Sequence, residues 1–439
     1  MHRNEESVET KRQRIAEKAR REPDCKFTSL FHLMKVELLW ECFGRLKEDA
    51  AAGIDGVIKA EYAKNLKENL EHLQQRLHQM KYIPQAVRRV YIPKAGSQKM
   101  RPLGIAALED KLVQSALANI LQMIYEQDFI DDSYGFRPKR SCHDALRSLN
   151  QTAANQPINH IVEADIRGFF DNVDQKQLMD FLSLRIGDTR VLRYIKRFLR
   201  AGIQEDGRYR ASDLGVPQGG SISPLLANIY LHYTLDLWFE KRFKRSCSGY
   251  ARLIRYADDF VVCFQTGHDA QRFRVEMEER LNQFGLEIAP EKTKILAFGP
   301  LAQQKAREKG GKAETFDFLG FTHYCSRTRD GKRFRMKRKT ISKRLTAKLR
   351  LMNEWLRRNR ILATAELMKK VRAKLQGHFA YYGVTDNSGS ISCYARQVTR
   401  LLQKWLNRRG KRGCCSWDKF RLLLERYPLP SPSIKVNLF

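Results

Sequence analysis

The spacing of apolar residues changes along this chain, and the changes divide the chain into segments. Residues 1–85 are helical in pattern, because Leu66, Leu70, Leu73 and Leu77 are spaced four, three and four residues apart. Residues 86–325 instead mix short apolar, β-branched runs with helical segments, which predicts alternating strands and helices. The run of five apolar residues 260–264 is typical of a buried strand.

Helical spacing returns beyond about residue 335. Three apolar stripes follow there: Ile341, Leu345, Leu349, Met352 and Trp355; Leu367, Val371, Leu375, Phe379 and Tyr382; Ile391, Tyr394, Val398, Leu401 and Trp405. A linker at 383–390 separates the second stripe from the third. The pattern predicts a small helical bundle at 326–412, with core packing as the role of the apolar residues. Two further segments are a polar, glycine-containing stretch at 299–315, which predicts a mobile loop, and a short tail at 413–439.

Charge changes this picture more than composition does. With 439 residues and 42% apolar residues, the chain is long enough for two or three domains with real cores. Its 81 basic and 49 acidic residues give a net charge of +32, which indicates a polyanionic partner. Residues 327–412 alone hold 26 Lys or Arg and 4 Asp or Glu. Such a concentrated basic segment is the electrostatic footprint of a nucleic-acid-binding protein.

The remaining composition argues against other classes. An anionic membrane surface is the rival partner, but no apolar run approaches the 18 or so residues of a membrane span. The first 21 residues are charged and lack the apolar core of a secretory signal. Nine cysteines are scattered without a Cys-x-x-Cys pair. We therefore expect a cytoplasmic protein without structural zinc, associated with the nucleoid when it acts on DNA.

Candidate chemistry is concentrated in two acidic positions that follow apolar runs. Asp258 and Asp259 stand between such runs, where paired carboxylates are costly unless a cation neutralises them. Hard carboxylate oxygens suit Mg²⁺, although an exposed hairpin turn is the ordinary alternative. Asp165 ends a second apolar run, where a helix N-cap is the ordinary alternative. Two strands that bring these carboxylates together would hold the two ions used in phosphoryl transfer.

A long series of motifs around these acids resembles reverse transcriptases, and group II intron-encoded reverse transcriptases with maturase activity in particular. The motifs occur in family order over roughly residues 50–325: Ala52-Gly53-Ile54-Asp55-Gly56, Tyr91-Ile92-Pro93-Lys94, Arg101-Pro102-Leu103-Gly104-Ile105, Tyr134-Gly135-Phe136-Arg137-Pro138, the strand that ends at Asp165, the segment 215–228, Tyr256-Ala257-Asp258-Asp259, Gly285-Leu286-Glu287-Ile288, Glu291-Lys292-Thr293-Lys294 and Phe318-Leu319-Gly320-Phe321. The resemblance implies an α+β fold with a helical N-terminal extension (1–85), the fingers and palm of a right-hand polymerase (86–325) and a basic, α-helical thumb or maturase bundle (326–412). The tail would be a DNA-contacting module or a strap across the bundle.

The resemblance also implies roles for the acids and for the residue that follows them in the family. Asp165 and Asp258 would hold two Mg²⁺ ions, with Asp259 as a supporting carboxylate. Lys292 would protonate the departing pyrophosphate, although a lysine in such a loop is usually only solvated.

Four further positions would contact the incoming nucleotide. Lys94 and Arg101 flank a turn and would bind its phosphates, unless the hairpin is only solvated. Phe170 would exclude a ribose 2′-hydroxyl, with core packing as the alternative. Gln218 opens a glycine-rich turn that would lie against the nascent base pair, where a plain strand-to-helix turn is the alternative.

The partners implied are intron RNA, an RNA template with a DNA primer, deoxynucleoside triphosphates and target DNA. The His/Cys nuclease pattern of many relatives is missing, so the chain resembles the subgroup without an endonuclease. Two alternatives stay open: a reverse transcriptase adopted by its host for defence or repair, and a non-catalytic RNA-binding splicing factor. The second would not need the carboxylates and the nucleotide-contacting residues, all of which are present.

Overall fold

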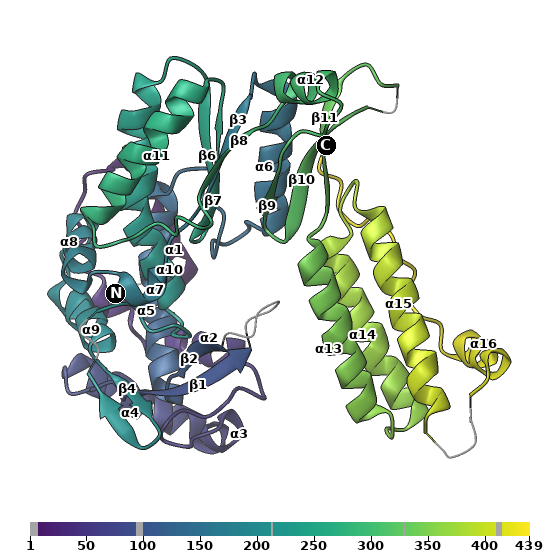
Figure 1. Cartoon of the computed structure of the whole chain (residues 1–439). Helices are drawn as coiled ribbons and strands as arrows, with labels where there is room; N and C mark the ends of the chain where they lie inside the picture. Colours follow the sequence, from purple (N-terminus) through teal and green to yellow (C-terminus); the bar gives the residue numbers. More distant parts are fainter. Residues whose placement is uncertain (1–7, 94–99, 212–213, 329, 410–414) are drawn as a thin grey trace.

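The computed structural model of the chain describes residues 8–93, 100–211, 214–328, 330–409 and 415–439. Figure 1 shows small sheets surrounded by helices, with a separate bundle of long helices toward the C-terminus. Within the described residues the sheets are three: an N-terminal sheet in the order β2-β1-β4-β5, a central sheet in the order β6-β7-β3-β8 and a C-terminal sheet in the order β11-β10-β9. The expected α+β class is confirmed.

The first part of the chain is helical, as its leucine spacing predicts. Its helices are α1 (Val8–Arg21), α2 (Val36–Arg45), α3 (Lys59–Tyr62) and α4 (Leu66–His78). Leu70, Leu73 and Leu77 are fully buried on one face of α4. Helices α1 and α2 pack against the long helix α5 (Leu108–Asp128). The extension is therefore built onto the neighbouring domain.

The central sheet is antiparallel and lies between two hydrophobic cores. Its strands are β3 (His160–Asp165), β6 (Ala251–Tyr256), β7 (Asp259–Phe264) and β8 (Lys294–Ala297). Alternate residues of one strand enter different cores: Val262 packs with the helices on one face, and Val261 packs with the core of the other face. Burial on both faces explains why the sequence of β7 is continuously apolar.

Helices and the N-terminal sheet complete this half of the molecule. The helices are α6 (Cys142–Asn155), α7 (Phe169–Asn172), α8 (Gln175–Arg185), α9 (Thr189–Leu199), α10 (Ser223–Leu231) and α11 (Gly267–Asn282). The N-terminal sheet contains β1 (Val87–Pro93), β2 (Met100–Ile105), β4 (Ile203–Glu205) and β5 (Arg208–Arg210). Strands β1 and β2 pair antiparallel, which agrees with the expected hairpin.

A C-terminal sheet joins the central sheet to the helical bundle. Its strands are β9 (Thr315–Phe318), β10 (Phe321–Arg327) and β11 (Phe334–Thr340). The bundle contains α13 (Ser342–Asn359), α14 (Thr364–Tyr382) and α15 (Ser388–Asn407), at the places that the three stripes predict. The expected domain boundary at residue 326 falls inside β10, so the β10–β11 hairpin connects the two expected domains.

Two segments were less readable from sequence. The loop predicted at 299–315 is wrong in part, because α12 (Pro300–Glu308) occupies most of it, with Pro300 as the helix start. The tail forms α16 (Trp417–Arg426) and then returns to the rest of the chain. Val436 pairs with Val384, and the carbonyl of Leu438 accepts a hydrogen bond from Asn150 of α6. The segment after α16 therefore fastens the bundle to the helix beside the central sheet.

Candidate active site

The register of the central sheet brings the three predicted carboxylates together. Strand β3 pairs with β7 so that Asp165 stands directly opposite Asp259. Asp258 occupies the turn between β6 and β7, next to the same end of the sheet. The three carboxylates also repel one another. After burial, the charge of Asp165 is a further cause of the raised pKa of both Asp258 and Asp259.

The β6–β7 turn needs a close and unusual backbone. Ala257 has φ of +58°, a left-handed conformation that alanine adopts only at a cost. Gly135 lies against it so closely that a Cβ at Gly135 would come 2.3 Å from the nitrogen of Ala257. Asn228 donates a hydrogen bond to the carbonyl of Gly135 at 2.6 Å and so fixes this contact. The glycine is required because only glycine lets the two backbones meet.

A fully buried arginine supports the same turn. The guanidinium of Arg255 is inaccessible to solvent and is paired with the equally buried carboxylate of Asp236, at 2.7 and 2.5 Å. It also donates to the side chains of Asn228 (3.0 Å) and Ser133 (2.8 Å) and to the carbonyl of Ala257 (2.9 Å). Because an arginine presents its donors in a rigid fork, this side chain holds strand, helix and turn in one arrangement.

Burial and mutual repulsion raise the pKa values of the carboxylates. Burial is the main cause of the raised pKa of Asp258, and Arg101 partly opposes it. The pKa of Asp259 rises from 3.8 to about 7, first through burial and then through Asp258 and Asp165. A carboxyl with a raised folded-state pKa binds more protons in the folded than in the unfolded chain. Stability without a cation therefore falls as pH rises from about 4 to about 7.

The donor chemistry fits a divalent cation, although the side chains are not arranged around one. Among the described residues, no three His, Cys, Asp or Glu side chains converge as a ready set of metal ligands. Lys292 instead forms an ion pair with Asp165. The crowded carboxylates raise one another's pKa and attract the ammonium group of Lys292. Mg²⁺ prefers such hard carboxylate oxygens and would neutralise the same negative charge.

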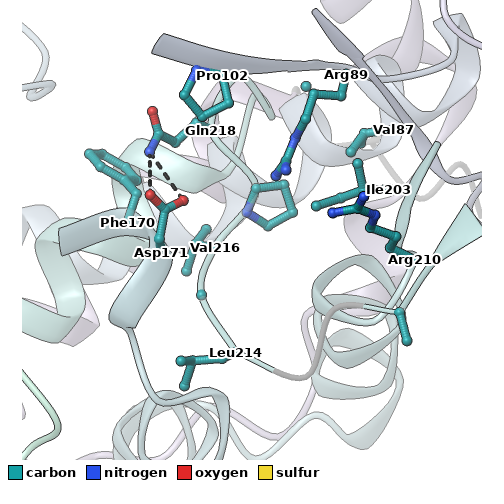
Figure 2. Close-up of a pocket in the computed structure, with 14 residues that line it drawn as sticks. Val87, Arg89, Pro102, Phe170, Asp171, Ile203, Arg210, Leu214, Val216 and Gln218 are labelled. Carbon is teal, nitrogen blue, oxygen red and sulfur yellow. Dashed lines mark hydrogen bonds between the residues drawn. The ribbon is translucent and has the colours of Figure 1, made fainter. Parts of the chain in front are cut away.

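A hollow of about 510 Å³ lies between the N-terminal sheet and α7, the short helix that follows Asp165 in the sequence. Figure 2 shows Phe170 and Asp171 on one wall, with Arg89 and Arg210 across from them. Phe170 is half-buried and makes an edge-on contact with the buried ring of Phe169. One residue of the predicted aromatic pair thus packs in the core, while the other lines the hollow.

Gln218 reaches the same hollow from the glycine-rich turn before α10. Its amide nitrogen donates to both carboxylate oxygens of Asp171 at 3.3 Å, the dashed lines in Figure 2. Gly219 has φ of +109°, and a Cβ there would come 2.4 Å from the carbonyl of Gly104 in β2. The carbonyl of Gln218 accepts from the amide of Gly104 at 2.6 Å. The turn is therefore clamped to the β1–β2 hairpin.

Arg101 and Lys94 are the two residues expected to bind the phosphates of the nucleotide. Arg101 is exposed on β2, and its charge partly offsets the rise in the pKa of Asp258 that burial causes. Lys94 lies outside the described residues.

Comparison with known proteins identifies the chain. The profile of the family described as "Reverse transcriptase (RNA-dependent DNA polymerase)" matches residues 92–323, more than half of the chain. The chain belongs to the reverse transcriptase family. The matched segment of this reverse transcriptase contains the three carboxylates, Lys292 and most of the residues that line the hollow. The family implies the fingers and palm of a polymerase within this segment.

Several relatives of this reverse transcriptase are intron-encoded. It is 40% identical over 221 residues to the group II intron-encoded protein LtrA of Lactococcus lactis subsp. cremoris, a match that covers 50% of this chain and 37% of LtrA. It is 37% identical over 273 residues to protein YkfC of Escherichia coli strain K12, covering 55% and 71% of the two chains. An uncharacterized 91 kDa protein in the cob intron of Schizosaccharomyces pombe is 44% identical over 153 residues, covering 35% and 18%. The chain thus spans little more than a third of the length of LtrA.

No helix in the part of the chain that the structure describes is long and apolar enough to cross a membrane.

The roles of Arg255, Asp236 and Asp171 were not predicted. A signal for Arg255 was present, since an arginine inside an apolar strand must find a buried partner. No such signal exists for Asp171, because an exposed aspartate after an aromatic pair is unremarkable.

Proposed function

We propose that this chain is an RNA-directed DNA polymerase encoded by a group II intron, which also binds the intron RNA, assists its splicing and takes part in retrohoming. The observation that carries the polymerase assignment is the register of β3 and β7, which places Asp165 opposite Asp259 and beside the turn that carries Asp258. The intron assignment is supported by the similarity to LtrA.

The carboxylates have a direct role in this proposal. Asp165, Asp258 and Asp259 would hold two Mg²⁺ ions, which when bound activate the primer 3′-hydroxyl and stabilise the leaving pyrophosphate. The ion pair of Lys292 with Asp165 must then open, because the ammonium occupies one of the carboxylate oxygens. Once released, Lys292 is free to donate a proton to the pyrophosphate.

The hollow would receive the incoming nucleotide. Arg101 and Lys94 bind its phosphates from the hairpin, and Gln218 contacts the nascent base pair. The hydrogen bonds to Asp171 fix the amide of Gln218, so that its carbonyl has a defined direction. Phe170 would stand where a 2′-hydroxyl would lie.

A primer-extension assay tests the polymerase proposal. The purified chain is given an RNA template with an annealed DNA primer, deoxynucleoside triphosphates and Mg²⁺, and we expect extension that EDTA stops. Tight RNA binding without extension would favour the non-catalytic splicing factor. A host-adopted polymerase would extend the primer equally well, and is distinguished by flanking DNA that lacks a group II intron RNA. The similarity to YkfC is compatible both with an intron-encoded and with a host-adopted polymerase.

Replacing Phe170 by valine should admit ribonucleotides. The smaller side chain opens space for the 2′-hydroxyl, so we expect the preference in kcat/KM for deoxynucleotides to fall by roughly 10- to 100-fold. Single-nucleotide incorporation with matched dNTP and rNTP measures the ratio. The adjacent Phe169→Val is the control, since it lowers stability in the core but should leave the ratio alone. An unchanged ratio in Phe170→Val would mean that the ring is only packing.

RNA binding by the bundle should depend on its basic surface. Lys343, Arg357 and Lys369 are exposed on α13 and α14. Changing all three to glutamine should reduce the slope of log K against log salt for RNA by roughly 0.7–0.9 for each phosphate that the variant no longer neutralises. The matched control changes Lys176, Arg193 and Lys196, three exposed residues of α8 and α9. Equal slopes for the two triple variants would place the RNA elsewhere.

A further inference from the structure

A second hollow of about 500 Å³ lies between α12 and the C-terminal sheet. Its wall contains Gln303 and Arg307 of α12, Lys312 of the following loop, Tyr324 of β10 and Lys339 of β11. Figure 1 shows α12 across the end of the molecule that is remote from the N-terminal sheet. None of these residues belongs to the candidate active site.

The register of the strands places this hollow away from the carboxylates. The β9–β10 turn lies at the active-site end, since the backbone of Leu319 forms a hydrogen bond with Asp259. Tyr324 pairs with Thr315 at the other end of β9. The four residue steps from Gly320 to Tyr324 correspond to about 13 Å of extended strand. A ligand in the hollow is therefore out of reach of the nucleotide that is being added.

The hollow is basic, and its cations are available. Arg307, Lys312 and Lys339 are exposed, and within the described chain none of the three has a carboxylate partner within the 4.0 Å of an ion pair. The three acids nearest to Arg307 and Lys312 in the sequence are Glu308, Glu314 and Asp317, and each accepts a hydrogen bond within the protein, Glu308 from Gln304 at 3.0 Å. Glu314 accepts from the amide of Ala297 at 2.8 Å, and Asp317 accepts from a threonine hydroxyl at 2.6 Å. Three unpaired cations around one cavity favour an anionic ligand with more than one phosphate.

An aromatic ring lies among these cations. Tyr324 is half-buried, and its ring lines the hollow with the ammonium of Lys339 at 6.0 Å from the ring centroid. Lys337 pairs with Tyr324 in the strand register, which adds a further cation beside the ring. A cavity of this size suits a ligand of about one nucleotide, and a ring with flanking cations is the arrangement by which proteins bind single-stranded nucleic acid.

We propose that this hollow binds an unpaired nucleotide of an RNA segment that lies outside the copied template–primer duplex. The base stacks on Tyr324, and the flanking phosphates contact Arg307, Lys312 and Lys339. The site extends the proposed function, on which it rests, because it gives the polymerase a second hold on its RNA. A base inside a duplex cannot stack there, since both of its faces are already covered.

A binding assay with the active site already filled tests the proposal. The full chain is first saturated with an unlabelled RNA–DNA template–primer whose primer ends in a dideoxynucleotide. Fluorescein-labelled oligouridylate of about 20 nucleotides, longer than a typical single-strand site, is then titrated by anisotropy. We expect binding to persist in the wild type. The R307Q/K312Q/K339Q variant should lower the salt slope by about 2, at roughly 0.7 for each of three phosphates.

Tyrosine variants separate stacking from charge. Tyr324→Leu should weaken binding of the oligouridylate by roughly 5- to 100-fold, whereas Tyr324→Phe should bind nearly as well as the wild type because a ring remains. Primer extension and the melting temperature are measured for every variant, and both should be unchanged for the triple variant and for Tyr324→Phe. The control triple variant in α8 and α9 removes the same charge elsewhere.

Several results would overturn the proposal. One is a wild type that binds no oligouridylate once the duplex is in place, and another is equal binding by the two triple variants. Competition by free UTP at the affinity of the oligomer would assign the hollow to a mononucleotide instead. Slower primer extension in R307Q/K312Q/K339Q would place it on the path of the duplex. A wild type that binds the oligomer as expected but extends no primer would refute the polymerase function and leave this site standing.

Discussion

Asp258→Asn should abolish DNA synthesis while leaving the chain folded and able to bind the template–primer. Asp258 is the carboxylate of the β6–β7 turn, and a neutral amide of the same shape would bind a divalent cation there much more weakly. Since metal-assisted stabilisation of the transition state is worth several kcal/mol, we expect kcat to fall by at least about 10³-fold. Single-turnover primer extension measures the loss, with the exposed Asp180→Asn of α8 as the control.

Thermal unfolding separates a metal ligand from a structural residue at this position. The wild type carries crowded carboxylates with raised pKa values, so removal of one charge should keep or raise the melting temperature in metal-free buffer at neutral pH. Mg²⁺ should raise the melting temperature of the wild type, because a ligand that binds only the folded state stabilises it. It should raise that of Asp258→Asn much less. A variant that melts early with or without Mg²⁺ would show that Asp258 is structural.

The parts of the fold and site that could be predicted are those that depend on a local sequence pattern. The strands, the acidic ends and the bundle were readable because each depends on a local pattern: a buried run, a charge at its end, or a stripe of period 3.6. Helix α12 was missed because its residues are polar and lie between glycines, so periodicity offered no signal. Its position instead depends on Pro300 at the helix start and on packing against β10.

The motifs predicted that Asp165 would lie near Asp258 and Asp259, but they did not predict the individual contacts between these distant segments. The pairing of Asp165 with Asp259 follows from the register of β3 and β7, which no local pattern fixes. Likewise, Gly135 appeared only as part of a motif. Its reason became visible when the turn at Ala257 was seen to lie against it. The ion pair of Lys292 with Asp165 joins residues 127 positions apart, and composition alone would have left that lysine in solvent.

Arg255→Leu should be among the most destabilising single changes in the chain. It leaves the carboxylate of Asp236, which is inaccessible to solvent, without a cation and removes the donor to the carbonyl of Ala257. Breaking a buried ion pair by removing one partner typically costs about 3–5 kcal/mol. Chemical denaturation should show a loss of this size. Arg252→Leu on the same strand is the control, and should cost less because Arg252 and its partner Asp132 are partly exposed.

A double-variant cycle then distinguishes the ion pair from simple packing. Arg255→Leu combined with Asp236→Leu removes both charges, so much of the lost stability should return if the unpaired carboxylate caused the damage. Activity need not return with it, because leucine cannot donate to Ala257 and the turn that carries Asp258 loses a hydrogen bond. Recovery of folding without recovery of kcat would establish that Arg255 positions the turn as well as stabilising the palm. Strictly additive losses would instead mean that the two charges act independently, and that packing around the guanidinium is what the fold requires.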